Sequence, residues 1–259
     1  MMSTLSRTVL ALILPLVLVT CRPDDTVEPD PVPTPTTGSL KLIIKPTWNG
    51  VPFALHQTYE NVSGYRVKVE MLKFYLGNVQ LVNGSGATTV KDVELFDMLH
   101  GGDTAVWSGL PTGTWSGLGM GLGVPQALND VDPINYASGH PLSLSHGTYW
   151  SWGSGYRFVM FDGKYDTTST GTGPVLQPFS MHTGMNVCYR VFDLPLASSL
   201  SITAGGTSEL VLELAVDRFF HSASDTLDLA VENASHGSDP AHTLALKLTE
   251  NIVHSFIPE

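Results

Sequence analysis

Basic residues are scarce in this chain of 259 residues. Lysine and arginine together number 13, against 24 aspartate and glutamate residues, and the formal net charge at pH 7 is -11. No run of basic residues interrupts this acidic balance. Nucleic acids and anionic membrane surfaces attract proteins through clustered positive charge. The composition therefore excludes both as expected partners.

The common sequence signatures of catalysis are also missing. The chain contains no HExxH or CxxC pair, no phosphate-binding glycine loop, no dinucleotide-binding fingerprint and no nucleophile elbow. Its carboxylates and hydroxyls show no spacing that indicates the active site of a metalloenzyme. We therefore expect a binding protein rather than an enzyme.

The N-terminal residues 1–21 indicate an export signal. Arg7 supplies a positive charge, and residues 9–19 form an apolar run that is short for a membrane span. The segment ends at Leu18-Val-Thr-Cys21, which resembles a bacterial lipobox, in which the cysteine becomes the lipidated first residue of the mature chain. An ordinary secretory signal is the alternative. Residues 22–38 are rich in proline and acidic residues, which predicts a disordered tether.

Helical periodicity is nearly absent from residues 39–259, where apolar residues tend to alternate with polar ones. Residues 65–71 alternate cleanly, and the apolar positions then change parity at Leu72, which predicts a β-bulge. Asn83-Gly-Ser-Gly86 predicts a hairpin turn. The one segment with fair helical spacing is residues 241–254. We predict a single all-β domain, an antiparallel β-sandwich with minor helical decoration near the C-terminus.

An aromatic stretch, Tyr149-Trp-Ser-Trp-Gly-Ser-Gly-Tyr-Arg-Phe158, stands out within this domain. Side chains alternate between the faces of a strand, so Trp150 and Trp152 would lie on the same face. Aromatic strands are usually core, and the face is either core or a binding site. Residues 117–123 carry a glycine at every second position, which leaves one strand face bare. We predict that the tryptophan pair packs on that face.

Imidazole and sulfur donors gather close together in one segment, formed by Met181, His182, Met185 and Cys188. Such donors suit soft ions such as Cu(I), although methionine and cysteine are also common core residues. Because Cys21 is expected to be lipidated, Cys188 lacks a disulfide partner. It is therefore either a buried thiol or a soft metal ligand.

Other histidines could complete a metal site. His236 and His242 lie just before the predicted helix, where exposed loop histidines are also expected. His56 is a further candidate ligand by residue type alone.

Several motifs, taken in order, resemble those of the MbnP-like family. They are Leu72-Lys-Phe-Tyr-Leu-Gly-Asn78, Gly113-Thr-Trp-Ser-Gly117, Gly121-Leu-Gly-Val-Pro125, Asn129, His140-Pro-Leu142, Tyr149 to Phe158 and His182-Thr-Gly184. The family comprises copper-binding proteins of the bacterial periplasm or cell surface. The order of the motifs is more specific than any one of them, and the Trp-Ser-Trp-x-x-Gly-Tyr-x-Phe segment is the strongest.

This resemblance implies a secreted β-sandwich that binds one copper ion through histidines. In some members, a di-haem peroxidase-like partner oxidises a tryptophan to kynurenine. Carried onto this sequence, the modified residue would be Trp150 or Trp152. The ligands would include His182, together with His242 or His236. A lipid on Cys21 would hold the protein in the cell envelope, facing the periplasm or lying on the outer-membrane surface.

A surface adhesion or glycan-binding module without metal is the alternative function. In such a module Trp150, Trp152 and Tyr156 would form an exposed platform. The two hypotheses predict different structures. Convergence of His182 and His242 near a tryptophan favours metal binding, whereas solvent-facing tryptophans far from the histidines favour the adhesion module.

Overall fold

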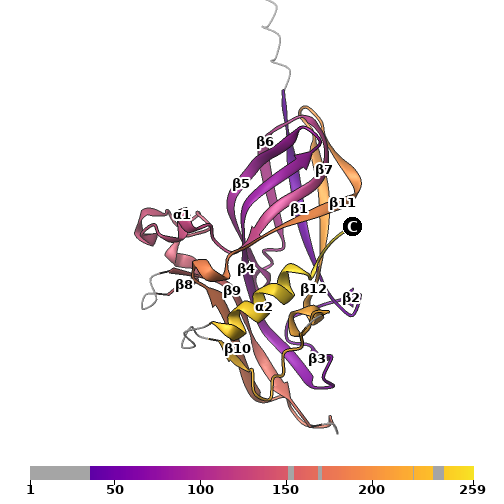
Figure 1. The fold of residues 1–259 in the computed structure, drawn as a ribbon, viewed down its shortest axis with the longest axis vertical. Helices are drawn as coiled ribbons and strands as arrows, with labels where there is room; N and C mark the ends of the chain where they lie inside the picture. The colour runs from indigo at the N-terminus through magenta and orange to yellow at the C-terminus, as the bar shows by residue number, and fades with distance from the viewer. Residues whose placement is uncertain (1–35, 151–154, 169–170, 224, 236–241) are drawn as a thin grey trace, which may run out of the picture. The chain divides into compact units, whose positions relative to one another are not determined.

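Two β-sheets form the framework of the domain (Figure 1). The computed structural model describes residues 36–150, 155–168, 171–223, 225–235 and 242–259. Within these residues the strands form one sheet of five strands and one of nine. The predicted β-sandwich is therefore confirmed. The expected leader and most of the expected tether, with Cys21, lie outside the described residues, as do Trp152 and His236.

The smaller sheet has the order β14-β12-β1-β2, and β6 also pairs with β1. Its strands are β1 (Thr37–Trp48), β2 (Val51–Pro52), β6 (Thr104–Pro111), β12 (Thr207–Ala215) and β14 (Phe256–Pro258). Strands β1 and β12 run parallel, from the pair Ser39 and Thr207 to the pair Thr47 and Ala215. The sandwich thus contains a parallel pair that the expectation of purely antiparallel sheets did not include.

The larger sheet has the order β11-β7-β4-β9-β10-β13, with β3 and β5 also paired with β4, and β8 with β9. Its strands are β3 (Thr58–Glu60), β4 (Arg66–Asn83), β5 (Gly86–Asp97), β7 (Gly113–Leu122), β8 (Tyr149–Trp150), β9 (Gly155–Asp166), β10 (Gln177–Gly184), β11 (Arg190–Ile202) and β13 (Ala234–Ser235). The short strand β13 lies parallel to β10.

Helices are few among the described residues. They are α1 (Gln126–Asn129), α2 (Thr243–Val253) and five 3-10 turns, η1 (Met98–His100), η2 (Pro133–Asn135), η3 (Leu144–His146), η4 (Asn186–Cys188) and η5 (Val216–Phe220). Helix α2 confirms the predicted C-terminal helix and buries Leu248 and Ile252. Across the same residues, no helix is both long and apolar enough to cross a membrane.

Alternating apolar residues of the strands fill the core of the domain. On β1, for example, Leu40, Leu42 and Ile44 are almost fully buried. Phe161 of β9 contacts Phe219 and the neighbouring phenylalanine of η5, with ring centroids 5.0 and 5.3 Å apart. Each such side chain contributes roughly 1.5–3 kcal/mol when it is removed from water. The period-two pattern of the sequence is thus the main source of the fold's stability.

The irregularities of β4 lie where the sequence predicts them. The pairing of β4 with β9 shifts register between Val69 and Met71, next to the change of parity at Leu72. The bulge keeps apolar side chains buried on both sides of the slip. At the other end of β4, Asn83 pairs with Gly86 across the predicted hairpin turn.

The bare glycine face of β7 is covered by residues other than the predicted tryptophan. A Cβ atom at Gly121 would lie 2.1 Å from the hydroxyl oxygen of Tyr189. One at Gly123 would lie 2.4 Å from Cδ2 of Phe158. Because Tyr189 and Phe158 take this space, the predicted packing of Trp150 on β7 is wrong.

Candidate functional site

His182 lies near the end of β10, on the strand face opposite to the main core. Phe179 and Met181 of the same strand are buried in the core, and His182 has the alternate parity. Its side chain is nevertheless only 7% exposed. An almost buried imidazole requires a hydrogen-bond partner, because burial removes its contact with water.

Asp162 of β9 supplies that partner. The Nε2 atom of His182 lies 2.9 Å from Oδ1 and 3.1 Å from Oδ2 of Asp162. His182 is opposite Met160 in the β9/β10 register, so Asp162 is its diagonal neighbour on the same face. The hydroxyl of Ser180 also donates to Asp162, at 2.7 Å. These contacts fix both the carboxylate and the imidazole.

This contact decides the tautomer of His182. A carboxylate accepts hydrogen bonds, so Nε2 carries the proton and donates a hydrogen bond to Asp162. In the neutral ring, Nδ1 then carries the lone pair. Histidine ligands of metals commonly donate their other ring N–H to a carboxylate in this way.

Trp150 of β8 lies beside His182. The two ring centroids are 6.5 Å apart at an interplanar angle of 47°. Trp150 is 7% exposed, and β8 pairs with the start of β9 through Trp150 and Gly155. The structure therefore brings one predicted tryptophan together with the predicted histidine.

Gly184 makes room for this tryptophan. A Cβ atom at Gly184 would lie 2.5 Å from Cζ3 of Trp150 and 2.7 Å from the carbonyl oxygen of Tyr156. Any larger residue would collide with the indole ring and with the backbone of β9. The His182-Thr-Gly184 motif thus combines the imidazole with the space for its aromatic neighbour.

The segment that leads to Trp150 is anchored through Thr148. Its carbonyl oxygen accepts a hydrogen bond from the backbone N–H of Arg157 at 2.8 Å. Its buried hydroxyl lies 2.7 Å from the hydroxyl of Tyr75. The guanidinium of Arg157 also donates to the carbonyls of Gly147 and Thr148. Burial lowers the pKa of Arg157, and the charge of Asp162 opposes this shift.

Two C-terminal elements lie against β10. Ser235 of β13 donates from its hydroxyl to the carbonyl oxygen of His182 at 2.9 Å. Helix α2 packs against β10 and begins after His242, whose backbone is left-handed, with φ 51°. Figure 1 shows α2, in yellow, next to β10. His242 thus belongs to an element that contacts the strand of His182.

His56, the other predicted histidine ligand within the described residues, does not lie at His182. His56 is exposed, and its backbone N–H donates to the carbonyl of Val69 on β4. It lies near β3, so β4 and β9 stand between it and β10. Three strand spacings correspond to roughly 14 Å.

The predicted sulfur cluster does not converge on His182 either. Met181 points into the core, and Met185 is 41% exposed. Cys188 is a buried thiol whose pKa is raised by burial. Among the described residues, no group of three or more His, Cys, Asp or Glu side chains is arranged to hold a metal ion.

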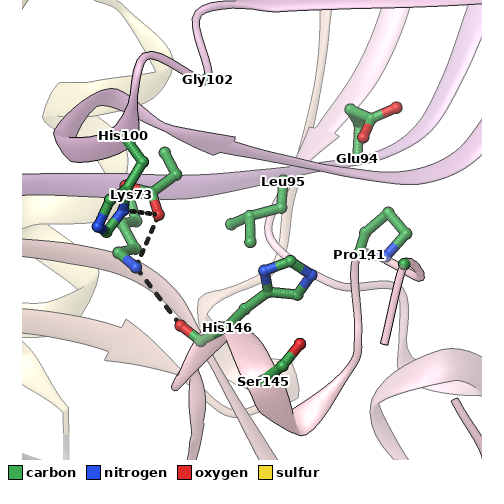
Figure 2. A pocket seen from close by; sticks show the side chains of 10 residues that line it. Lys73, Glu94, Leu95, His100, Gly102, Pro141, Ser145 and His146 are labelled. Carbon is green, nitrogen blue, oxygen red and sulfur yellow. Dashed lines mark hydrogen bonds and ion pairs between the residues drawn. The ribbon is translucent and has the colours of Figure 1, made fainter. Parts of the chain in front are cut away.

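A separate pocket lies between β4, β5 and the loop that precedes β8. The ammonium of Lys73 lies there, 2.8 Å from Asp97 and 3.4 Å from the carbonyl oxygen of His146. Figure 2 shows the contact between Lys73 and His146 as a dashed line. His100 also contacts Asp97, at 2.8 Å. Burial alone would raise the pKa of Asp97, but its hydrogen bonds to Lys73 and His100 outweigh burial and lower it. The ammonium disfavours a cation in this pocket.

Sequence reasoning missed Asp162, Arg157 and Ser235. Asp162 is a charged residue within an otherwise apolar strand, and it lies on the same face of the sheet as His182. A charged residue at such a position indicates a functional role. Ser235 gave no such indication, because its role depends on the pairing of β13 with β10.

Comparisons with known proteins agree with the family resemblance of the sequence motifs. A family model described as MbnP matches residues 37–238. Among solved structures, "MbnP from Methylosinus trichosporium" is similar, with 16% sequence identity and a TM-score of 0.49. The alignment covers 78% of this chain and 82% of that protein. No curated protein sequence matches the chain.

Proposed function

The chain belongs to the MbnP family, and on that premise we propose that it is a non-enzymatic envelope lipoprotein that binds a single copper ion. The observation that carries this proposal is the contact of His182 with Asp162 beside Trp150. Imidazole nitrogen is a common ligand of copper, and the carboxylate orients the ring for that role.

The donor chemistry around His182 fits copper in part. His182 supplies one nitrogen, and His242 and His236 are the proposed further ligands. Trp150 in its native form offers only an N–H donor and cannot bind a metal through that group. A kynurenine at position 150 would offer an aryl amine and a ketone oxygen as additional donors. The site is therefore proposed to be completed by oxidation of Trp150, with Trp152 as the other candidate.

The oxidation requires a separate oxidant. We assign it to a di-haem peroxidase-like partner protein, as the family resemblance implies. Lipidation of Cys21, followed by a tether that ends where β1 begins at Thr37, would hold the domain at the envelope membrane, within reach of such a partner.

The adhesion alternative requires an exposed aromatic platform. Trp150 is 7% exposed and Tyr156 is fully buried, so neither can stack on a sugar in solution. The hydroxyl of Tyr156 is also occupied, because it donates to the carbonyl of Leu142 at 2.6 Å. The burial of these rings favours the metal hypothesis.

Retention of Cu(I) tests the proposed function. The full-length protein purified from its native envelope is loaded with Cu(I), desalted, and its copper is measured against protein concentration. We expect about one equivalent in the native protein and a large loss in His182→Ala. His100→Ala is the matched control, because His100 is exposed and lies in the separate pocket. Equal retention by the native protein and His182→Ala would refute the proposal.

A further inference from the structure

A second pocket is built on the far side of the core from His182. It has a volume of about 490 Å³ and is lined by Arg218, His221, Ser222, Ala223 and His254. Arg218 belongs to η5, and His254 follows α2 directly. A volume of this size suits a small organic ligand.

Turn η5, which carries Arg218 of this pocket, packs on the core face of β9 and β10, and the His182 site lies on their other face. Phe220 of η5 packs against Phe161 of β9 and Phe179 of β10, with ring centroids 5.3 and 6.0 Å apart. Side chains alternate between the two faces of a strand, so Asp162 and His182 lie on the face opposite to these phenylalanines. The residues that line this pocket thus differ from those proposed to hold copper.

A fixed frame presents the three nitrogen-bearing side chains. Asn251 of α2 donates from Nδ2 to the carbonyl of Phe219 at 3.1 Å, which ties the helix to η5. The backbone N–H of His221 bonds to the carbonyl of Arg218 at 3.2 Å. The elements that carry Arg218, His221 and His254 are thus held together before any ligand binds, which lowers the entropic cost of binding.

The charge of Arg218 is unusual in this acidic protein. Its side chain is exposed, and its guanidinium has no ion pair or hydrogen bond within the described residues. Every other described lysine and arginine has at least one such partner. The chain has 24 acidic residues, but none of the described ones forms an ion pair with Arg218.

Asp217 precedes Arg218 in η5, and its carboxylate is held by another contact. It is 8% exposed, and its Oδ1 accepts a hydrogen bond from the backbone N–H of Asn49 at 3.0 Å. Its Oδ2 lies 4.0 Å from Nε2 of His221, which is beyond hydrogen-bond distance. The described lining of the pocket itself contains no carboxylate.

We propose that this pocket binds an oxyanion, carried by a phosphate- or carboxylate-bearing small molecule. The planar guanidinium of Arg218 can bind two oxygens of such a group at once. Each of His221 and His254 adds a ring N–H donor, even as a neutral imidazole. The ligand's charge would pair with a guanidinium that has no acidic partner among the described residues.

Isothermal titration of the metal-free, full-length protein tests this site. The probes are inorganic phosphate and citrate, each added at constant ionic strength in chloride buffer. We expect at least one probe to bind, and Arg218→Ala to weaken that binding about tenfold or more, because a charge-assisted hydrogen-bond pair is lost. Arg218→Lys keeps the positive charge but loses the planar guanidinium. Its affinity for the probe should therefore fall between that of the native protein and that of Arg218→Ala.

Matched controls separate the pocket from general charge effects. Lys41→Ala removes the same unit of charge from an exposed ion pair elsewhere and should leave the affinity unchanged. His182→Ala should also bind the probes normally, which distinguishes this site from the copper site. Binding of phosphate alone would identify a phosphoryl ligand, and binding of citrate alone a carboxylate. No binding of either probe, or equal binding by Arg218→Ala, would overturn the proposal.

Discussion

The Nε2 atom of His182 lies 2.9 Å from Oδ1 of Asp162, and the two side chains come from adjacent strands. Because they are diagonal neighbours, the register of β9 and β10 alone brings them together. The carboxylate keeps the proton on Nε2 and presents Nδ1 as the nitrogen with the lone pair. The orientation of the proposed copper ligand is thus a direct consequence of strand pairing.

Replacement of this carboxylate should weaken copper binding without removing it. In Asp162→Asn the side chain keeps its size, but it loses the negative charge that makes His182 a stronger metal ligand. Loss of such a supporting partner typically lowers metal affinity about 10–100-fold. Competition with a chromophoric Cu(I) chelator measures the change.

The control for this variant is Asp193→Asn, which changes an exposed carboxylate on β11 and should leave the affinity as in the native protein. If Asp162→Asn bound copper as tightly as the native protein while His182→Ala lost it, Asp162 would have no positioning role.

Oxidation should be confined to the tryptophan beside His182. Trp150 is the described tryptophan that neighbours the imidazole, whereas Trp48, Trp107 and Trp115 are buried in the main core. Peptide mapping by mass spectrometry of protein from its native envelope should find a modified residue at position 150. The three core tryptophans serve as internal controls and should be unmodified. Unmodified Trp150 in that sample would rule out its oxidation in this protein.

The fold could be predicted from local patterns because strand periodicity and turn chemistry are local properties. The parity change at Leu72 indicates the bulge, and the residues from Asn83 to Gly86 indicate the hairpin. The parallel pairing of β1 with β12 could not be predicted in this way. It joins the two ends of the domain, and neither strand carries a mark of its distant partner.

The candidate site was harder to predict for the same reason. His182 and Trp150 stand out by residue type, but their contact depends on the pairing of β8 with β9 and of β9 with β10. The glycine face of β7 correctly indicates that a large ring packs on it. It does not specify which ring, and Tyr189 fits where the tryptophan was expected.

Acid should reduce stability through Asp166. The N–H and hydroxyl of Thr168 donate to its carboxylate at 2.9 and 2.7 Å, and with the Arg66 guanidinium they lower its pKa from 3.8 to about 2. A depressed pKa means that this stabilisation is present above the unfolded value, near 3.8, and is lost as the pH falls through about 2.

Urea unfolding of the native protein and Asp166→Asn at several pH values between 2 and 6 measures this effect. The difference in unfolding free energy between the two proteins should be nearly constant above pH 4 and should shrink toward pH 2. A difference that does not change with pH across that window would contradict the assignment to Asp166.

Gly184→Ala should disturb both stability and the candidate site. The added methyl group would lie 2.5 Å from the indole of Trp150 and 2.7 Å from the carbonyl of Tyr156, and the backbone oxygen cannot move aside without breaking strand pairing. Overpacking of this kind costs about 1–3 kcal/mol, measured by thermal or urea unfolding. Gly139→Ala is the matched control, because a Cβ there meets nothing within 4 Å, and its stability should change by less than about 0.5 kcal/mol. Under the copper proposal, the displaced indole of Gly184→Ala should also reduce copper retention, whereas equal stability of the two variants would show that Trp150 does not pack against Gly184.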